Sequence, residues 1–371
     1  MRADRGGDEQ LVAELCRVAQ AEVGEADAVV RRHLRRVAPL VTPDVGERLV
    51  REAVARLDGL GALDALLADE TVDEVLVNAG GDIWVERDGQ LERCGHLAAA
   101  DLAIVVERIL APLGRRLDRT SPVVDARLPD GSRVCAVIPP VALDGACLAV
   151  RRFRDRDLPL EAFGDEAVGA VLDLALAGRC NVIVSGSTSS GKTSLLNSIL
   201  GRTSPNERLV IIEDTAELLP GADHLVRLEA RPPTPDGPVA VTLEQLVRTA
   251  LRLRPDRLVV GEVRGPEVLA LVQALNTGHD GSWSTCHANS AVDALHRLET
   301  LVIQAAPSWP LMAVRQHLTR SIDVVVHLAR CADGGRRVVE VGEVVVDGDR
   351  LHLRPVVERG VVVGRIGRVR S

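Results

Sequence analysis

The residues best suited to chemistry lie in the octet Gly-Ser-Thr-Ser-Ser-Gly-Lys-Thr at positions 186–193. This spacing matches the phosphate-binding pattern G-x-x-x-x-G-K-[ST], in which backbone N–H groups and a lysine ammonium contact phosphate oxygens. Lys192 is also the only lysine among the 45 lysine and arginine residues of the chain. Arginine is a larger, planar cation, so a chain that uses arginine everywhere else keeps lysine where a compact ammonium is required. We therefore predict a nucleotide-binding site rather than a lysine left by a bias in composition.

The segments on both sides of this octet have the pattern that a phosphate-binding loop requires. Residues 180–184 are typical of a buried strand, and residues 194–200 are typical of a helix. The positive end of the helix dipole would face the phosphates, Lys192 would bridge the β- and γ-phosphates, and the Thr193 hydroxyl would bind Mg²⁺. ATP and Mg²⁺ are the expected ligands. The residues expected to contact the nucleotide are Gly186, Ser187, Thr188, Ser189, Ser190, Gly191, Lys192, Thr193 and Ser194.

A second apolar segment, residues 208–212, is expected to form a strand that ends at Glu213. Ligands of open α/β sheets bind at the carboxyl ends of the strands, so this carboxylate should lie near the phosphates. We expect Glu213 to take part in catalysis and to hold the metal ion. Glu217, four residues later, is as consistent with the same site as with the protein surface.

A third apolar segment, residues 257–261, brings Glu262 to the same edge of the predicted sheet. Conventional phosphate-loop ATPases place an aspartate for Mg²⁺ here, whereas this chain offers a glutamate. Its expected role is to orient or deprotonate the attacking water. The alternative is a glutamate that caps a helix or forms a salt bridge. Gly261 is expected to keep side-chain bulk away from the Glu262 carboxylate.

A fourth segment, residues 277–290, carries two histidines. A strand running from 281 to 288 would place His287 at the carboxyl edge of the sheet, beside the γ-phosphate. We expect His287 to contact that phosphate and His279 to have a structural or coupling role, although an isolated histidine is more often a satisfied structural residue. Cys286 would point to the opposite face and pack in the core.

The N-terminal half contains a further candidate for anion binding. Pro-Asp-Gly at 129–131 is a turn signal that would place Arg127 opposite Arg133 across a hairpin. Like charges directly opposite each other are destabilising unless an anion lies between them. The pattern therefore predicts an anion contact, and the alternative is a pair of solvated arginines. Arg151 and Arg152 are weaker candidates for the same role.

Changes in pattern divide the chain into several regions. Residues 1–57 are predicted to form a helical extension, and residues 58–153 a smaller domain with short strands. A charged, proline-containing stretch at 154–163 is the expected linker. Residues 164–371 alternate apolar strands with amphipathic helices, which predicts an α/β domain with a mainly parallel sheet. Within it, residues 323–370 carry turn signals typical of appended antiparallel strands, to which no chemistry is assigned.

Composition narrows the class of protein. The formal net charge is −8, which makes nucleic acid an unlikely partner, although a local basic patch is compatible with this sum. The seven cysteines form no CxxC pair, which argues against a zinc module and against a disulfide framework. No apolar run approaches the roughly 18 residues of a membrane span, and no signal peptide is evident. We therefore expect a cytoplasmic protein.

Four of these segments, in this order, resemble the boxes of the bacterial secretion ATPases that power type II and type IV secretion, pilus assembly and archaeal flagella. The likeness extends from about residue 60 to the end of the chain. Within the superfamily the sequence looks most similar to the tight-adherence (Flp) pilus motors of the CpaF/TadA type. The segments that carry the resemblance are 186–193, 212–217, 254–265, 277–290, 124–134 and 138–140.

The resemblance implies a RecA-like P-loop ATPase domain preceded by a PAS-like α+β domain, in a homohexamer. It also implies an inner-membrane platform protein as partner, so that the motor lies at the inner face of the cell membrane. Two alternatives stay open: an ATPase for DNA transfer of the conjugation or competence type, and a nucleotide-gated regulatory subunit that does not hydrolyse ATP. The residues given catalytic or phosphate-binding roles by the likeness are Lys192, Thr193, Glu213, Glu262, His287, Arg127 and Arg133.

Overall fold

The computed structural model describes residues 5–22, 25–57, 59–87, 89–128, 130–152, 158–231, 239–331, 334–347 and 350–370. The chain divides into two compact units, Met1–Arg154 and Asp155–Ser371. Part of the linker expected at 154–163 lies outside the described residues. Its far end forms a short 3₁₀ helix, η2 (Leu160–Phe163), whose Leu160 and Phe163 are buried in the core of the second unit. That end of the expected linker is therefore part of the second unit.

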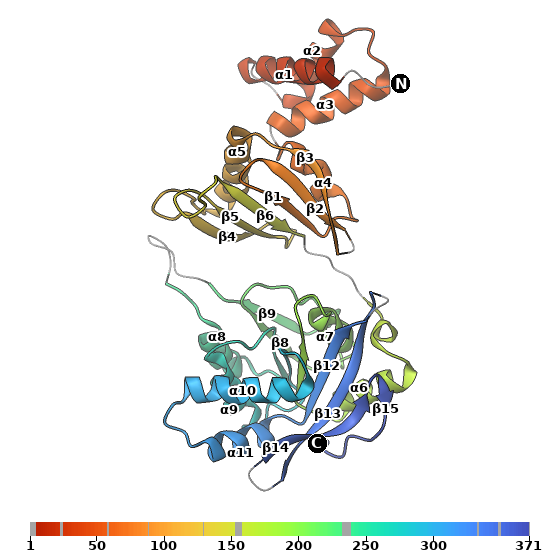
Figure 1. Ribbon diagram of the computed structural model, residues 1–371, viewed down its shortest axis with the longest axis vertical. Coiled ribbons are helices and arrows are strands. Elements are labelled where there is room, and N and C mark those ends of the chain that lie inside the picture. Colours follow the sequence, from red (N-terminus) through yellow and green to blue (C-terminus); the bar gives the residue numbers. More distant parts are fainter. Residues whose placement is uncertain are drawn as a thin grey trace. The chain divides into compact units, whose positions relative to one another are not determined.

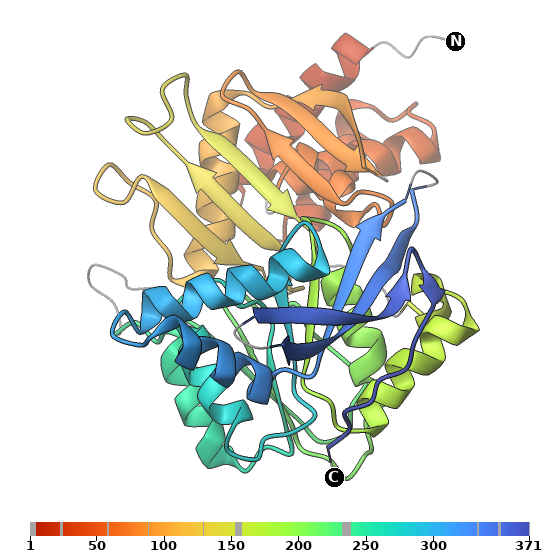
Figure 2. The same ribbon diagram turned by 60° about the horizontal axis from the view of Figure 1, so that its bottom comes forward.

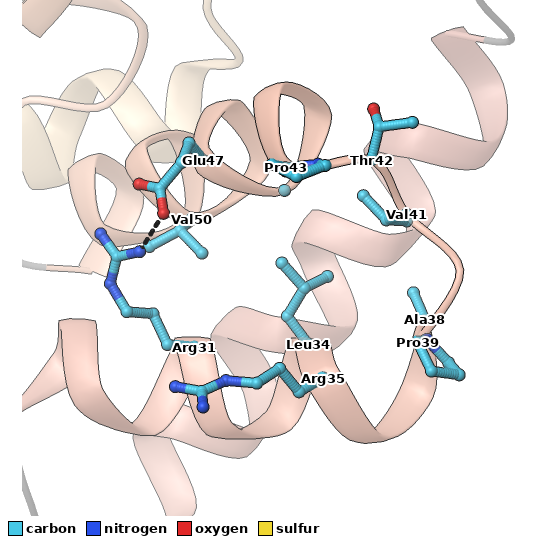
Figure 3. A pocket seen from close by; sticks show the side chains of 11 residues that line it. Arg31, Leu34, Arg35, Ala38, Pro39, Val41, Thr42, Pro43, Glu47 and Val50 are labelled. Carbon is cyan, nitrogen blue, oxygen red and sulfur yellow. Dashed lines mark hydrogen bonds and ion pairs between the residues drawn. The ribbon is translucent and has the colours of Figure 1, made fainter.

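The first unit begins with three helices, α1 (Arg5–Ala21), α2 (Ala26–Val37) and α3 (Pro43–Leu57). Pro43 is the first residue of α3, where the absent N–H group would have had no helical partner. A shallow pocket lies between α2 and α3, with Leu34 and Val50 pointing into it and Arg31 paired with Glu47 at one end (Figure 3). The helices pack through the apolar residues Val12, Leu15, Val30, Leu34, Leu49, Val50 and Ala53.

A six-stranded antiparallel sheet forms the rest of this unit, in the order β3-β2-β1-β6-β5-β4 (Figure 1). Alternate residues are buried along β1, β2, β5 and β6, since one face of the sheet packs against α5, whereas the edge strand β3 is exposed throughout. The α5 residue Arg108 donates hydrogen bonds to the carbonyls of Leu57 and Gly59, and so joins this layer to the end of α3. The elements are α4 (Ala62–Ala68), β1 (Glu74–Val77), β2 (Asp82–Arg87), β3 (Gln90–His96), α5 (Ala99–Leu110), η1 (Ala111–Leu113), β4 (Val123–Arg127), β5 (Arg133–Val137) and β6 (Cys147–Arg151).

The second unit is built on a nine-stranded sheet in the order β15-β14-β13-β12-β7-β11-β10-β8-β9. The strands from β12 to β9 are parallel, as the α/β pattern predicts. Its first elements are α6 (Glu166–Ala177), β7 (Val182–Gly186), α7 (Lys192–Leu200), β8 (Leu209–Glu213), β9 (Leu225–Glu229), α8 (Leu243–Ala250), η3 (Leu251–Leu253) and β10 (Arg257–Val260). The remaining ones are α9 (Glu267–Leu275), β11 (Trp283–His287), α10 (Ala291–Ala305), α11 (Leu311–Ser321), β12 (Val324–Arg330), β13 (Arg336–Asp347), β14 (Arg350–Glu358) and β15 (Val361–Val362).

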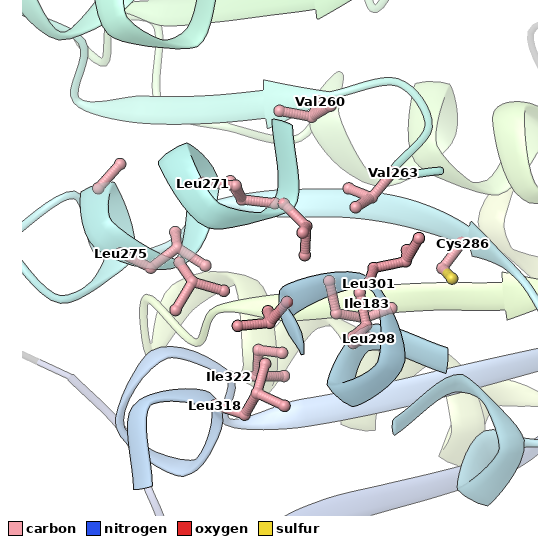
Figure 4. Close-up of a cluster of buried hydrophobic side chains, with 14 of the residues drawn as sticks. Ile183, Val260, Val263, Leu271, Leu275, Cys286, Leu298, Leu301, Leu318 and Ile322 are labelled. Atoms are coloured by element: carbon pink, nitrogen blue, oxygen red, sulfur yellow. The ribbon is translucent and has the colours of Figure 1, made fainter. Parts of the chain in front are cut away.

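Helices cover both faces of this sheet. Helices α6 and α7 lie on one face, and α8 to α11 lie on the other (Figures 1 and 2). Figure 4 shows the hydrophobic core between the sheet and the helices α8 to α11, which contains Ile183 of β7, Cys286 of β11 and Leu298 of α10. Cys286 is fully buried there, which confirms its predicted place in the core. The fold class predicted from the sequence, a RecA-like α/β domain with a smaller α+β domain, is confirmed.

The C-terminal segment differs in one respect from the expectation of antiparallel strands. Strands β13, β14 and β15 are antiparallel to their neighbours, but β12 is parallel to β7. The chain reaches β12 from β11 through the helices α10 and α11, and such a helical crossover returns it in the same direction. Asp323, just before β12, accepts a hydrogen bond from the N–H of Asn181 (2.8 Å), next to β7.

Among the helices that the structure describes, none is both long and apolar enough to cross a bilayer.

Candidate nucleotide-binding site

The octet forms a tight loop between β7 and the first turn of α7. Gly191 has a φ of 97° and Ser189 a φ of 59°, so the loop turns through left-handed conformations before the helix begins. A side chain at Gly186 would lie 2.7 Å from the Leu328 carbonyl, which excludes any larger residue. Ser187 is exposed, whereas Ser190 is buried with its hydroxyl contacting no hydrogen-bond partner among the described residues. This is the strand–loop–helix context that the motif requires.

Lys192 is buried at the first position of α7, with 8% of its surface exposed. Its Nζ donates to the carbonyls of Gly186 (3.0 Å) and Ser187 (2.9 Å). Burial lowers the pKa of the ammonium, and the nearby Glu262 carboxylate partly offsets this. The carbonyls of the loop therefore hold the ammonium group of the single lysine in place.

His287 links this lysine to Glu262. Its Nδ1 lies 3.5 Å from Lys192 Nζ, and its Nε2 lies 2.7 Å from Oε1 of Glu262. Burial and then the positive charge of Lys192 lower the pKa of the imidazole. The structure thus brings together three residues from separate segments of the sequence. The side chains of Glu262 and His287 remain partly open to solvent.

Glu213 ends β8 as predicted, but its carboxylate is held by backbone. Oε1 accepts hydrogen bonds from the N–H groups of Glu217 and Leu218, both at 2.9 Å. Oε2 is buried and contacts no hydrogen-bond partner among the described residues. Burial raises the pKa of Glu213 to about 7. Glu217 therefore contacts the Glu213 carboxylate through its backbone N–H, and this contact does not depend on the Glu217 side chain.

Gly261 makes room for the carboxylate of the neighbouring strand. A side chain there would come within 2.6 Å of Cγ of Glu213. The adjacent register of β8 and β10 explains this, because Ile212 pairs with Val260 and the residues that follow lie side by side. The expected role of Gly261 toward Glu262 stays a prediction. The sequence indicated a need for glycine but could not assign the side chain that required it.

Two side-chain oxygens near the phosphate-binding loop could bind Mg²⁺. Mg²⁺ keeps several waters and is usually held by one or two protein oxygens together with substrate phosphates. Two oxygens fit that requirement: the buried Oε2 of Glu213, which has no partner within the described ranges, and the Thr193 hydroxyl in the first turn of α7. Among the described residues no group of three or more His, Cys, Asp or Glu side chains could hold a metal ion by itself.

The predicted hairpin in the first unit has the expected register. Arg127 of β4 is opposite Arg133 of β5, and Arg133 is opposite Arg151 of β6. Three arginines therefore lie in one row across adjacent strands, followed by Glu74 of β1 opposite Arg151. Pro129 of the turn lies outside the described residues. The expected contact of Arg127 and Arg133 with nucleotide phosphates stays a prediction.

Two residues beside the loop were not singled out from the sequence. His327 of β12 is buried, and its Nδ1 lies 2.9 Å from Oγ of Ser185, the residue before Gly186. Arg336 of β13 lies against Gly191. Both belong to the C-terminal segment, whose sequence carries no motif that indicates nearness to the loop. His279, in contrast, contacts the carbonyl of Ala274 (3.1 Å) and fits the structural role considered for it.

Comparison with known families decides the class of protein. The model of the family described as "Type II/IV secretion system protein" matches residues 56–361. The chain belongs to this family. The match begins at the end of α3, so most of the three-helix extension precedes it. Membership in this family of secretion ATPases agrees with the loop, the acidic residues and the histidine described above.

Two curated relatives cover most of the chain. The "Putative conjugal transfer protein Rv3659c" of Mycobacterium tuberculosis is 40% identical over 306 residues, which is 79% of this chain and 86% of the relative. The "Conjugal transfer protein TrbB" of Rhizobium radiobacter is 36% identical over 305 residues, or 79% and 90% of the two chains. These names refer to conjugal transfer and not to tight-adherence pili.

A solved structure supports the fold of this secretion ATPase family member. The crystal structure of the pilus retraction motor PilT with bound ADP matches with a TM-score of 0.54 and 21% identity, over 78% of this chain and 80% of PilT. At this level of identity the likeness concerns the fold alone.

The buried Glu213 predicts a dependence of stability on pH in metal-free, nucleotide-free buffer. Its folded pKa, about 7, exceeds the usual 4.5. The contribution of Glu213 to the free energy of unfolding should therefore be largest below about pH 4.5 and be lost as pH rises to about 7, by on the order of 3 kcal/mol. Urea unfolding between pH 5 and 8 measures it. In Glu213→Gln this part of the pH dependence should disappear, and an unchanged profile would contradict the burial argument.

Proposed function

We propose that the protein hydrolyses ATP and couples hydrolysis to the assembly or transport work of a pilus or secretion apparatus. The observation that carries this proposal is the contact chain from Lys192 through His287 to Glu262 at the mouth of the phosphate-binding loop. A lysine that binds phosphates and a carboxylate that can orient or deprotonate water are recurring parts of sites that hydrolyse a γ-phosphate, and here a histidine lies between the two. Family membership supports the proposal independently.

Each residue has a proposed role. Lys192 would bind the β- and γ-phosphates, and the N–H groups of the loop would bind the remaining phosphate oxygens. Thr193 and Glu213 would hold Mg²⁺, whose charge offsets that of the phosphates. Glu262 would orient the attacking water and accept its proton. His287, whose lowered pKa favours the neutral imidazole, would contact the γ-phosphate and position Glu262.

The catalytic unit proposed is a homohexamer, with Arg127 and Arg133 of the first unit contacting phosphates. The row of like charges in the sheet of that unit supports an anion there. A motor of this class would lie in the cytoplasm at the inner face of the membrane and deliver force to an inner-membrane platform protein.

Mg²⁺-dependent ATP turnover per protomer, measured over a wide range of protein concentration, tests this function. Specific activity that rises with concentration and then levels is expected if the sites are completed between subunits. If ATP binds but is not turned over, hydrolysis by the isolated protein is contradicted. That result would favour a regulatory subunit that binds ATP without hydrolysing it.

A second candidate function, DNA transfer, is favoured by the names of the relatives, which are described as conjugal transfer proteins. The tight-adherence pilus motor remains the first candidate because segments 124–134 and 138–140 resemble that branch. Adding single- or double-stranded DNA to the ATPase assay separates the two. Salt-sensitive stimulation is expected for a DNA-transfer ATPase, since phosphate contacts release counterions. Unchanged turnover and no salt-sensitive DNA binding would count against it.

A further inference from the structure

The C-terminal strands place an arginine directly beside the phosphate-binding loop. Arg336 is the first residue of β13. Its Cδ and Cβ lie 3.1 and 3.4 Å from the point where a side chain on Gly191 would begin. Phe163 contacts the same point at 3.5 Å. The left-handed φ of Gly191 favours glycine, and the Arg336 stem packs directly against this residue.

The register of β13 explains how Arg336 reaches the loop. Arg336 and Val338 are two residues apart on one strand, so their side chains project from the same face of the sheet. Val338 is buried in the core that also contains Leu195 and Leu196 of α7. This is the face on which α7 lies, and Arg336 is located where that helix begins.

Positive charge is concentrated at this position, and Glu262, the carboxylate near Lys192, offsets it only in part. The N-terminus of a helix carries a partial positive charge, and the first residue of α7 is the cation Lys192. Arg336, whose stem lies against Gly191, brings a third positive group near the start of α7. Among the described residues its side chain forms no hydrogen bond or ion pair, although many other arginines of the chain pair with Asp or Glu. The buried hydroxyl of Ser190, which has no hydrogen-bond partner in the part of the chain that the structure describes, lies in the same loop.

We propose that Arg336 is an additional phosphate-binding residue of the nucleotide site, contributed by the C-terminal strands of the same chain. Its ligand is the phosphate group of a nucleoside di- or triphosphate, which would offset the three positive groups. This inference rests on the proposed nucleotide-binding function and adds a residue outside the four motifs that carry it.

The test is equilibrium binding of a fluorescent ADP analogue (mant-ADP), with Mg²⁺, to the full chain. Arg336→Met keeps the apolar stem and removes the charge, so the dissociation constant should rise about tenfold, the size of a charge-assisted hydrogen bond. Arg336→Lys should recover much of the affinity. Arg337→Met is the matched control, since Arg337 is exposed and projects from the opposite face, and its affinity should equal that of the wild type. Equal affinity in Arg336→Met and wild type would overturn the proposal.

Two further measurements distinguish phosphate binding from packing. In Arg336→Met the affinity for inorganic pyrophosphate, measured by competition with mant-ADP, should fall by the same factor as the affinity for the nucleotide. An unchanged affinity for pyrophosphate would place the contact on the nucleoside and overturn the phosphate assignment. The melting temperature of the unliganded Arg336→Met protein should be no lower than that of the wild type, because a like charge is removed. A lower value, without a loss of affinity, would show a packing role instead. If Lys192→Ala binds mant-ADP as well as the wild type, the proposed nucleotide site itself fails.

Discussion

Replacing Lys192 by arginine should reduce ATP turnover by at least about a hundredfold, the effect of removing a major electrostatic contact from an active site. The ammonium is buried and donates to two loop carbonyls at 2.9 and 3.0 Å. A planar guanidinium cannot fit between these carbonyls and still reach His287, 3.5 Å away. Steady-state turnover with saturating MgATP is the measurement, together with the affinity for mant-ATP, which should also fall.

This substitution is more informative than Lys192→Ala because it keeps the charge. All the other residues counted among the 45 lysines and arginines of the chain are arginines. The melting temperature of the unliganded variant serves as the control for folding. Normal turnover in Lys192→Arg would mean that the single lysine is an accident of composition and that the phosphates are bound in another way.

Glu262→Gln should abolish turnover, with a loss of about 10²- to 10⁴-fold, while the affinity for MgATP stays close to that of the wild type. Glutamine keeps the volume of the side chain and can still contact His287, whose Nε2 lies 2.7 Å from the carboxylate. It cannot accept a proton from water. Single-turnover hydrolysis and mant-ATP binding, measured side by side, separate the chemical step from binding.

Glu244→Gln is the matched control for this experiment. Glu244 lies on α8 and forms an exposed ion pair with Arg248 one helical turn away, so its loss should leave turnover unchanged. Undiminished hydrolysis in Glu262→Gln would refute the role of Glu262 in catalysis. Full function in cells that carry this variant, combined with lost turnover in vitro, would instead favour a regulatory subunit that binds ATP without hydrolysing it.

Much of the candidate site could be predicted because each motif is local. The octet at 186–193 specifies its own loop, since glycines at two fixed positions allow the turn and the helix follows directly. Glu213 and Glu262 follow apolar segments, and the carboxyl ends of parallel strands meet at one edge. The opposition of Arg127 and Arg133 follows from the length of a single turn. In each case the controlling interactions lie within a few residues or follow from a general rule of parallel sheets.

Only the tertiary structure decided which side chains touch. Ser185 and His327 are 142 residues apart in the chain and become neighbours because β12 pairs with β7, an order that no local pattern encodes. Because β13 pairs with β12, its Arg336 lies on the sheet face that α7 covers and contacts Gly191. The contact between His287 and Glu262 likewise depends on β11 and β10 being adjacent. The sequence by itself determined the chemical groups and the strand ends at which they stand, whereas strand order, which is set by long-range packing of the two cores, determined their partners.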